Sequence, residues 1–149
     1  MNKRVLVPLA QGCEELEAVT IIDLLRRAGI EVVVAGLDDE VITASRGVRL
    51  LADMSLDLAL QQEFDMVALP GGLPGSDHLA ADSRISDVLR LMNETGRFVG
   101  AVCAAPKVLV RSGILNGKNA TAYPGVLQAE NHPLISGEAV TRDGRVITS

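Results

Sequence analysis

The sequence predicts an α/β fold, a doubly wound and mostly parallel sheet with helices on both faces. Three observations support this prediction. The chain has 149 residues, which suits one domain over residues 1–149 with a sizeable core. Hydrophobic residues make up 48% and aromatic residues 2%, so the core must consist of Val, Leu, Ile and Ala. Short β-branched runs also alternate with segments whose apolar residues have helical spacing.

The first three elements form a βαβ unit. Residues 5–9 are an apolar run that predicts a buried strand. Residues 15–28 show helical spacing, and Gly29 is placed to end that helix. Residues 30–35, IEVVVA, are strongly β-branched and predict the second buried strand. A strand, a helix and a strand in succession indicate a parallel sheet.

The middle of the chain has weaker patterns. Residues 38–55 are compatible with a short hairpin that turns at Gly47. Residues 56–64 are compatible with a short helix, and residues 65–69 predict the third clear strand, which runs into the loop PGGLPGS.

The last elements continue the alternation of helices and strands. Residues 76–94 predict one helix closed by Gly96, residues 97–102 a fourth strand, and residues 104–111 the helix after it. Further strands are predicted over residues 120–123 and 138–148.

The composition argues against two broad classes of function. A net charge of -5 and 2% aromatic residues do not suit nucleic-acid binding, which uses basic patches and stacking rings. No apolar run approaches the roughly 18 residues that a membrane span requires. The first apolar run meets acidic residues at once, which indicates a strand and not a signal peptide. Two cysteines make no disulfide framework, so a reducing cytoplasm is expected.

Three loops are expected at the carboxyl ends of the strands, where ligands bind in such folds. They are QGCEELE, PGGLPGS and CAAP. Cys103 lies where a buried strand turns into a helix, which would expose its side chain on a sharp turn. The helix N-terminus is expected to lower the pKa of the thiol. The alternative is that Cys103 is simply a small buried hydrophobic residue.

The other two loops supply complementary groups. Gly71 and Gly72 let backbone amides approach a ligand and form an oxyanion hole that faces Cys103, although an ordinary turn with a helix cap at Ser76 is the alternative. The loop is neither a GxGxxG fingerprint nor a phosphate-binding P-loop. Glu17 lies a turn into the first helix, where a half-buried carboxyl near a thiolate would share a proton with sulfur.

Taken together, these motifs resemble a known family. VLVPLAQGCEELEAV, RRAGIEVVVAG, SRGVRLLAD, FDMVALPGG, AVCAAP and the final ITS are similar to the ThiJ/PfpI superfamily, on the branch of the Parkinson-disease-associated protein deglycase. The resemblance covers essentially the whole chain. EELE, LPGG and AVCAAP in this order are highly specific, although each is weak alone.

The resemblance implies a flavodoxin-like fold and a homodimer. The thiol chemistry expected at the site needs no metal or organic cofactor. It implies that Cys103 is the reactive, oxidation-prone cysteine and that Glu17 hydrogen-bonds it. Gly71, Gly72 and Ala104 would supply backbone N–H groups. Arg27 and Arg46 fall in the matching stretches RRAGI and SRGV. Arg46 and Tyr123 are possible neighbours of the site.

The chain also departs from the family pattern. Proteases and heat-shock chaperones of the superfamily carry His directly after the cysteine, where this chain has Ala104, which argues against protease activity. Tyr123 replaces a histidine found before Pro124 in some close relatives. His78 and His132 are expected to be surface residues first. Relatives continue with a C-terminal helical segment beyond Ser149, and a sheet without that layer would expose an apolar face. Either the chain is a fragment or cleaved product, or a partner or swapped element is expected to cover that face.

Three functional hypotheses follow. The first is a glutathione-independent glyoxalase or protein deglycase that uses the Cys103 thiolate and Glu17 on small reactive carbonyls such as 2-oxoaldehydes. The second is a redox sensor or chaperone of oxidative stress that uses oxidation of the same cysteine. The third is an inactive structural homologue.

Overall fold

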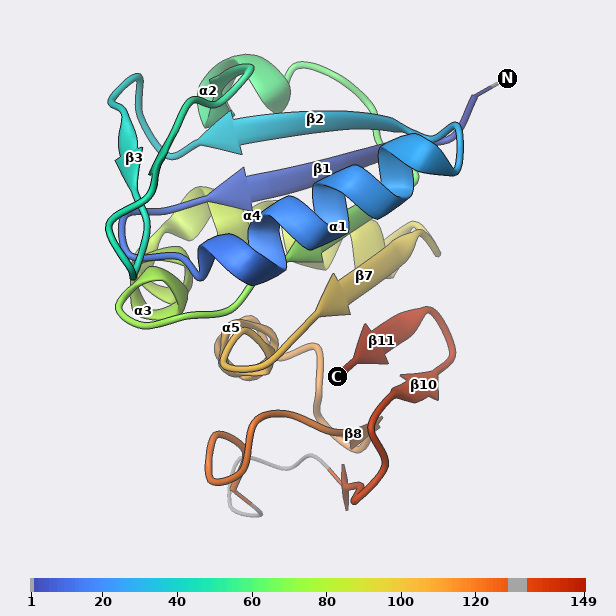
Figure 1. The fold of residues 1–149 in the computed structure, drawn as a ribbon. Helices are drawn as coiled ribbons and strands as arrows, with labels where there is room; N and C mark the ends of the chain where they lie inside the picture. Colours follow the sequence, from blue (N-terminus) through green and yellow to red (C-terminus); the bar gives the residue numbers. More distant parts are fainter. Residues whose placement is uncertain (1, 129–133) are drawn as a thin grey trace.

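The computed structural model describes residues 2–128 and 134–149, and its centre is a seven-stranded sheet. The strands lie in the order β10-β11-β7-β6-β1-β2-β5, and all neighbouring pairs are parallel except β10 with β11 (Figure 1). Their bounds are β1 (Arg4–Leu9), β2 (Glu31–Gly36), β5 (Met54–Ser55), β6 (Met66–Leu69), β7 (Phe98–Ala101), β10 (Thr141–Asp143) and β11 (Val146–Thr148). The predicted mostly parallel sheet is therefore confirmed.

The order of the long strands is that of a flavodoxin-like fold. Without β5 and β10, the order β2-β1-β6-β7-β11 corresponds to 2-1-3-4-5 in chain order. The chain thus reverses its direction of winding between β1 and β6. In such folds, ligands bind outside the carboxyl ends of the strands at this reversal.

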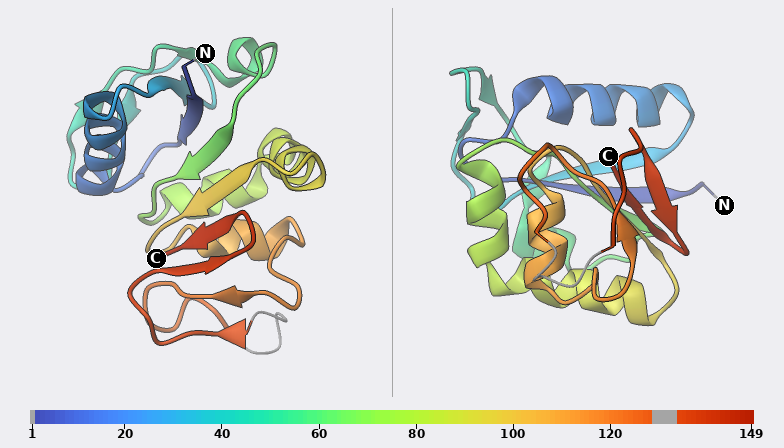
Figure 2. Two further views of the ribbon diagram at one scale, coloured as in Figure 1. Left: turned by 90° about the vertical axis from the view of Figure 1, so that its right-hand side faces the viewer. Right: turned by 90° about the horizontal axis from the view of Figure 1, so that it is seen from below.

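Helices cover both faces of the sheet, as predicted. Helix α1 (Glu15–Arg27) lies on one face, and α3 (Gly75–Ala81), α4 (Ser83–Glu94) and α5 (Pro106–Arg111) lie on the other (Figures 1 and 2). Each face has its own apolar cluster of buried side chains. Because both faces are covered, β1 and β2 are buried over nearly their whole length, which explains their unbroken apolar runs.

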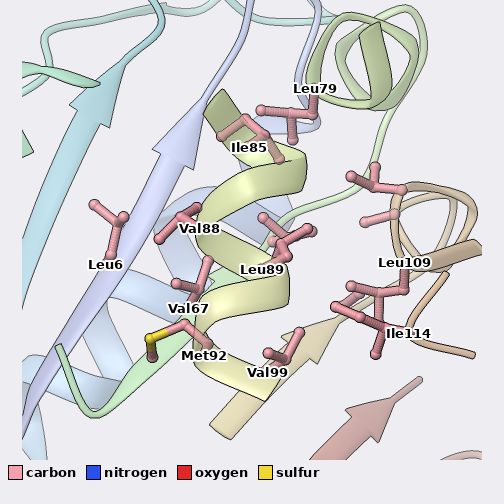
Figure 3. Packing of buried hydrophobic residues seen from close by; sticks show 14 of the residues in the cluster. Leu6, Val67, Leu79, Ile85, Val88, Leu89, Met92, Val99, Leu109 and Ile114 are labelled. Carbon is pink, nitrogen blue, oxygen red and sulfur yellow. The ribbon is translucent and has the colours of Figure 1, made fainter. Parts of the chain in front are cut away.

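The larger cluster joins strand residues to the helices of the second face. Figure 3 shows Leu6, Val67 and Val99 of the strands against Leu89 and other residues of α4. Several leucines and isoleucines are completely buried there, including Leu79, Ile85 and Leu89. The predicted core of Val, Leu, Ile and Ala is confirmed, with Phe64 and Met92 as additional members.

The predicted helix over residues 76–94 is wrong in one respect, because the structure divides it at Asp82. Asp82 has an extended backbone (φ -86°, ψ 115°), and its carboxylate accepts a hydrogen bond from the Arg84 N–H. An aspartate in this role is a favourable N-cap, so a new helix begins at Ser83. Ser76 does not cap α3, which begins at Gly75 without a side-chain cap.

Other differences concern short elements. The hairpin around Gly47 is confirmed as β3 (Ile42–Thr43) and β4 (Arg49–Leu50), which pair antiparallel. Helix α2 ends earlier than predicted (Leu56–Ala59), and α5 begins at Pro106 because proline favours the first helical position. The strand predicted over residues 120–123 is only β8 (Asn119–Ala120), which pairs with an unpredicted β9 (Leu134–Ile135), while residues 138–148 contain the β10–β11 hairpin.

An apolar groove lies beside α1. It has a volume of about 250 Å³ and is bordered by Leu24 and Leu25 of α1, Met66 of β6, Gly100 of β7 and Ile147 of β11. Among the described residues, none of the helices combines the length and hydropathy of a membrane span.

Candidate functional site

The site forms where three loops meet at the carboxyl ends of β1, β6 and β7. Glu17 follows β1, Gly71 and Gly72 follow β6, and Cys103 follows β7. The backbone N–H of Gly71 donates a hydrogen bond to the Glu17 carboxylate (2.7 Å). The structure therefore brings the loops together at the reversal between β1 and β6, as the sequence predicts.

Cys103 has an unusual backbone conformation. Its φ is 57°, a left-handed value that residues other than glycine rarely adopt. The Cys103 N–H donates to the Ser149 carbonyl oxygen (2.7 Å), and the Cys103 carbonyl oxygen accepts from the Tyr123 N–H (2.9 Å). These bonds hold the cysteine on a sharp turn between β7 and α5. Strained conformations of this kind concentrate at functional sites, and a nucleophile on a strand-to-helix turn is one example.

Glu17 and Cys103 touch across Gly71. The half-buried Glu17 carboxylate hydrogen-bonds both the Gly71 N–H and the Cys103 thiol. A Cβ atom on Gly71 would lie 2.7 Å from Glu17 Oε2, 2.8 Å from the Val102 carbonyl oxygen and 2.9 Å from Cys103 Cβ. No real side chain tolerates such contacts, so only glycine allows the carboxylate and the thiol to meet here.

Two backbone N–H groups lie beside the Cys103 thiol. The N–H groups of Gly72 and Ala104 both act on the thiol in the direction that lowers its pKa. Gly72 has a φ of 90°, which glycine adopts readily, and a Cβ there would collide with the backbone of Cys13 and Glu14. Fixed N–H groups beside a nucleophile can stabilise an oxyanion, because they need no reorganisation when negative charge develops.

The pKa of the Cys103 thiol differs in direction from the expectation. Burial and the Glu17 carboxylate, through its hydrogen bond and its charge, raise the pKa of Cys103, and they outweigh the opposing N–H groups of Ala104 and Gly72. The expected lowering of the net pKa is therefore wrong, although the backbone N–H groups do act in the expected direction. Helix α5 begins only at Pro106, so Cys103 lies outside its first turn, where a helix dipole acts. A thiol with a raised pKa needs a nearby base to act as a nucleophile.

A cavity of about 660 Å³ opens onto Cys103 and Glu17. Tyr123 lines it beside the cysteine, which agrees with its predicted position near the site. Ile135, Glu138 and Ser149 also line it, although the sequence did not indicate them. Ile135 and Glu138 belong to no motif that the sequence analysis singled out, and Ser149 ends the ITS stretch of the family resemblance, to which no role at the site was assigned.

The remaining candidates lie elsewhere. Arg46 is exposed and is not among the residues that line the cavity, and its backbone N–H donates to Glu15 (2.8 Å). Arg27 is exposed and pairs with Asp23 (2.9 Å). Exposed His78 lies with Nδ1 2.9 Å from the Gln11 carbonyl oxygen and lines a different cavity. His132 lies outside the described residues.

The described residues were searched for side chains that could bind a metal ion. Within residues 2–128 and 134–149, no group of three or more His, Cys, Asp or Glu side chains is arranged to hold a metal ion.

Comparisons with known proteins give a consistent result. Residues 3–149 match the model of the DJ-1/PfpI family. Protein dj-1beta of Drosophila melanogaster is 43% identical over 152 residues, which span 100% of this chain and 81% of that protein. Glutathione-independent glyoxalase DJR-1.2 of Caenorhabditis elegans is 30% identical over 142 residues, 90% of this chain and 76% of that protein. The crystal structure of Drosophila melanogaster DJ-1beta superposes with a TM-score of 0.94 at 42% identity, covering 100% of this chain and 82% of that one.

Proposed function

This chain belongs to the DJ-1/PfpI family, and on that premise we propose that it converts 2-oxoaldehydes such as methylglyoxal into 2-hydroxy acids without glutathione. The observation that carries the proposal is the contact of Cys103 with Glu17 beside the N–H groups of Gly72 and Ala104. A relative described as a glutathione-independent glyoxalase, 30% identical to this chain, supports it further.

The reaction begins with nucleophilic addition. Cys103 sulfur attacks the aldehyde carbon and forms a C–S bond, while Glu17 accepts the thiol proton. The C=O electron pair moves onto oxygen, and the N–H groups of Gly72 and Ala104 stabilise this oxyanion. Transfer of the proton to that oxygen gives a hemithioacetal and restores the Glu17 carboxylate.

The second stage moves a hydrogen between the two carbons. The Glu17 carboxylate removes the proton from the former aldehyde carbon, and the electron pair passes to the ketone oxygen through an enediolate. A proton then returns to the neighbouring carbon, while the hydroxyl proton on the former aldehyde carbon passes to the former ketone oxygen. The product is a 2-hydroxyacyl thioester on Cys103. Water then cleaves the C–S bond and releases lactate and the free thiol. The aldehyde carbon is oxidised and the ketone carbon reduced, so no external oxidant or cofactor is required.

The same groups would serve a protein deglycase. A protein thiol or amine that has added to methylglyoxal carries a hemithioacetal or hemiaminal, which releases the aldehyde reversibly. Capture of that aldehyde by Cys103 would end in the same 2-hydroxy acid. The glyoxalase and deglycase activities would therefore use the same site.

Lactate formation provides the direct test of this function. We expect the purified protein to convert methylglyoxal to lactate in the absence of glutathione. Rapid acid quenching followed by peptide mass mapping should find a lactoyl group on Cys103 and none on buried Cys13. Loss of methylglyoxal without lactate, or an adduct confined to lysine and arginine side chains, would contradict the proposal.

A redox-sensor role is a second candidate, favoured by the contrast between the two cysteines. Cys13 is fully buried, and burial raises its pKa to about 11. Cys103 is partly exposed, and two N–H groups beside its sulfur could stabilise the charge of a sulfinate.

Peroxide should therefore oxidise the two cysteines at different rates. Under increasing peroxide, we expect peptide mass mapping to show Cys103 as sulfenic or sulfinic acid while Cys13 remains reduced, because an accessible thiol reacts first. Equal oxidation of both cysteines would argue against a tuned site. The homodimer, the cytoplasmic location and a chaperone role stay predictions.

A further inference from the structure

The cavity at Cys103 is much larger than methylglyoxal requires. Its volume of about 660 Å³ lies in the range of pockets that enclose drug-sized ligands. Cys103 and Glu17 occupy one part of the lining, and apolar residues extend from it, including Tyr123, Leu127 and Ile135. Within the described residues, the reacting atoms of an aldehyde leave this apolar part of the lining uncovered.

The position of Tyr123 beside the nucleophile is set by the backbone. The Tyr123 N–H donates a hydrogen bond to the Cys103 carbonyl oxygen (2.9 Å). The backbone from which the Tyr123 side chain extends is therefore adjacent to Cys103. The side chain is 62% exposed and lines the cavity, so part of its apolar surface is still available to a ligand. An aromatic ring in this place can stack on a planar substituent.

Ile135 provides a second apolar surface in the same cavity. Its side chain is 53% exposed in strand β9, whereas its neighbour Leu134 is 57% exposed and does not line the cavity. The chain thus offers two adjacent apolar residues with similar exposure, of which only one faces the ligand space.

The charge of the lining disfavours anions. Among the described residues that line the cavity, the charged side chains are Glu17 and Glu138, both acidic. A carboxylate or phosphate on the substrate would meet like charge there. Neutral substituents avoid this cost.

Building on the proposed function, we propose that this site prefers neutral 2-oxoaldehydes with a bulky apolar substituent, which packs against Tyr123 and Ile135. Arylglyoxals and long-chain alkylglyoxals belong to this class. Burial of an aromatic or alkyl group from water strengthens binding of both the substrate and the transition state.

The test compares phenylglyoxal with methylglyoxal as the ratio of their kcat/KM values. We expect Tyr123→Ala to lower this ratio about tenfold and Ile135→Ala about threefold, because each removes apolar surface that contacts the phenyl ring. Leu134→Ala is the matched control and should leave the ratio unchanged. Equal ratios for Ile135→Ala and Leu134→Ala, together with no effect of Tyr123→Ala, would overturn the inference.

A second measurement does not depend on turnover. Cys103 is alkylated with N-benzyl-iodoacetamide, iodoacetamide or iodoacetate, and each rate is divided by the rate with free cysteine. We expect the benzyl reagent to be favoured over iodoacetamide by about fivefold, and iodoacetate to be disfavoured. If the protein keeps this preference among the reagents but does not turn over aldehydes, the proposed function is refuted and the cavity preference is not. If the three alkylation rates have the same ratios as with free cysteine, the cavity preference is refuted.

Discussion

Cys103→Ser is expected to reduce methylglyoxal turnover by on the order of 10⁴-fold or more, to the background of the assay. Serine keeps the size and the hydrogen-bonding pattern of cysteine, so the turn at φ 57° and its bonds to Ser149 and Tyr123 should survive. The hydroxyl is far less acidic and less nucleophilic than a thiol, so the C–S bond of the proposed hemithioacetal has no equivalent. Steady-state kinetics with lactate detection measures the effect.

The matched control is Cys13→Ala. Cys13 is fully buried against the backbone of Gly72 and Gly75 and contacts no substrate space, so its replacement should keep most of the turnover. Thermal unfolding of both variants separates loss of chemistry from loss of fold. Retained turnover in Cys103→Ser would end the case for covalent catalysis at this site.

Glu17→Gln is expected to separate the acidity of the thiol from catalysis. The carboxylate raises the pKa of Cys103, through its hydrogen bond and its charge, after the larger effect of burial. Glutamine removes that negative charge, so the thiolate is less disfavoured and the pKa of Cys103 should fall. Alkylation of Cys103 should then reach its half-maximal rate at a lower pH than in the unmodified protein.

Turnover of the same variant should nevertheless fall by about 10²- to 10⁴-fold, because glutamine cannot accept the thiol proton or move a proton between the carbons. Asp23→Asn, which removes an exposed carboxylate from the same helix, should change neither readout. An alkylation midpoint at higher pH would show that the Glu17 carboxyl donates a proton to sulfur, and unchanged turnover would exclude Glu17 as the base.

Local patterns were sufficient for most of the fold. The β-branched run IEVVVA and the apolar run at residues 5–9 predict strands because a sheet covered on both faces buries every residue of its central strands. The division at Asp82 was missed because helical spacing continues across it, while the cap depends on a single side chain turning back to the Arg84 N–H. Strands β5, β8 and β9 were missed or misplaced because two-residue strands carry almost no periodicity.

The sequence by itself determined which residue types reach the sheet edge: a thiol on a strand-to-helix turn, a carboxyl one turn into a helix, and paired glycines after a strand. Only the tertiary structure decided how they interact. Gly71 lets Glu17 approach Cys103, and that proximity, together with burial, raises the pKa of the thiol where a local helix argument predicted the opposite. The cavity is also lined by three residues that lie more than 30 positions after Cys103 in the sequence: Ile135, Glu138 and Ser149. Interactions of this kind depend on the distance between residues in space, which cannot be read directly from their order in the sequence.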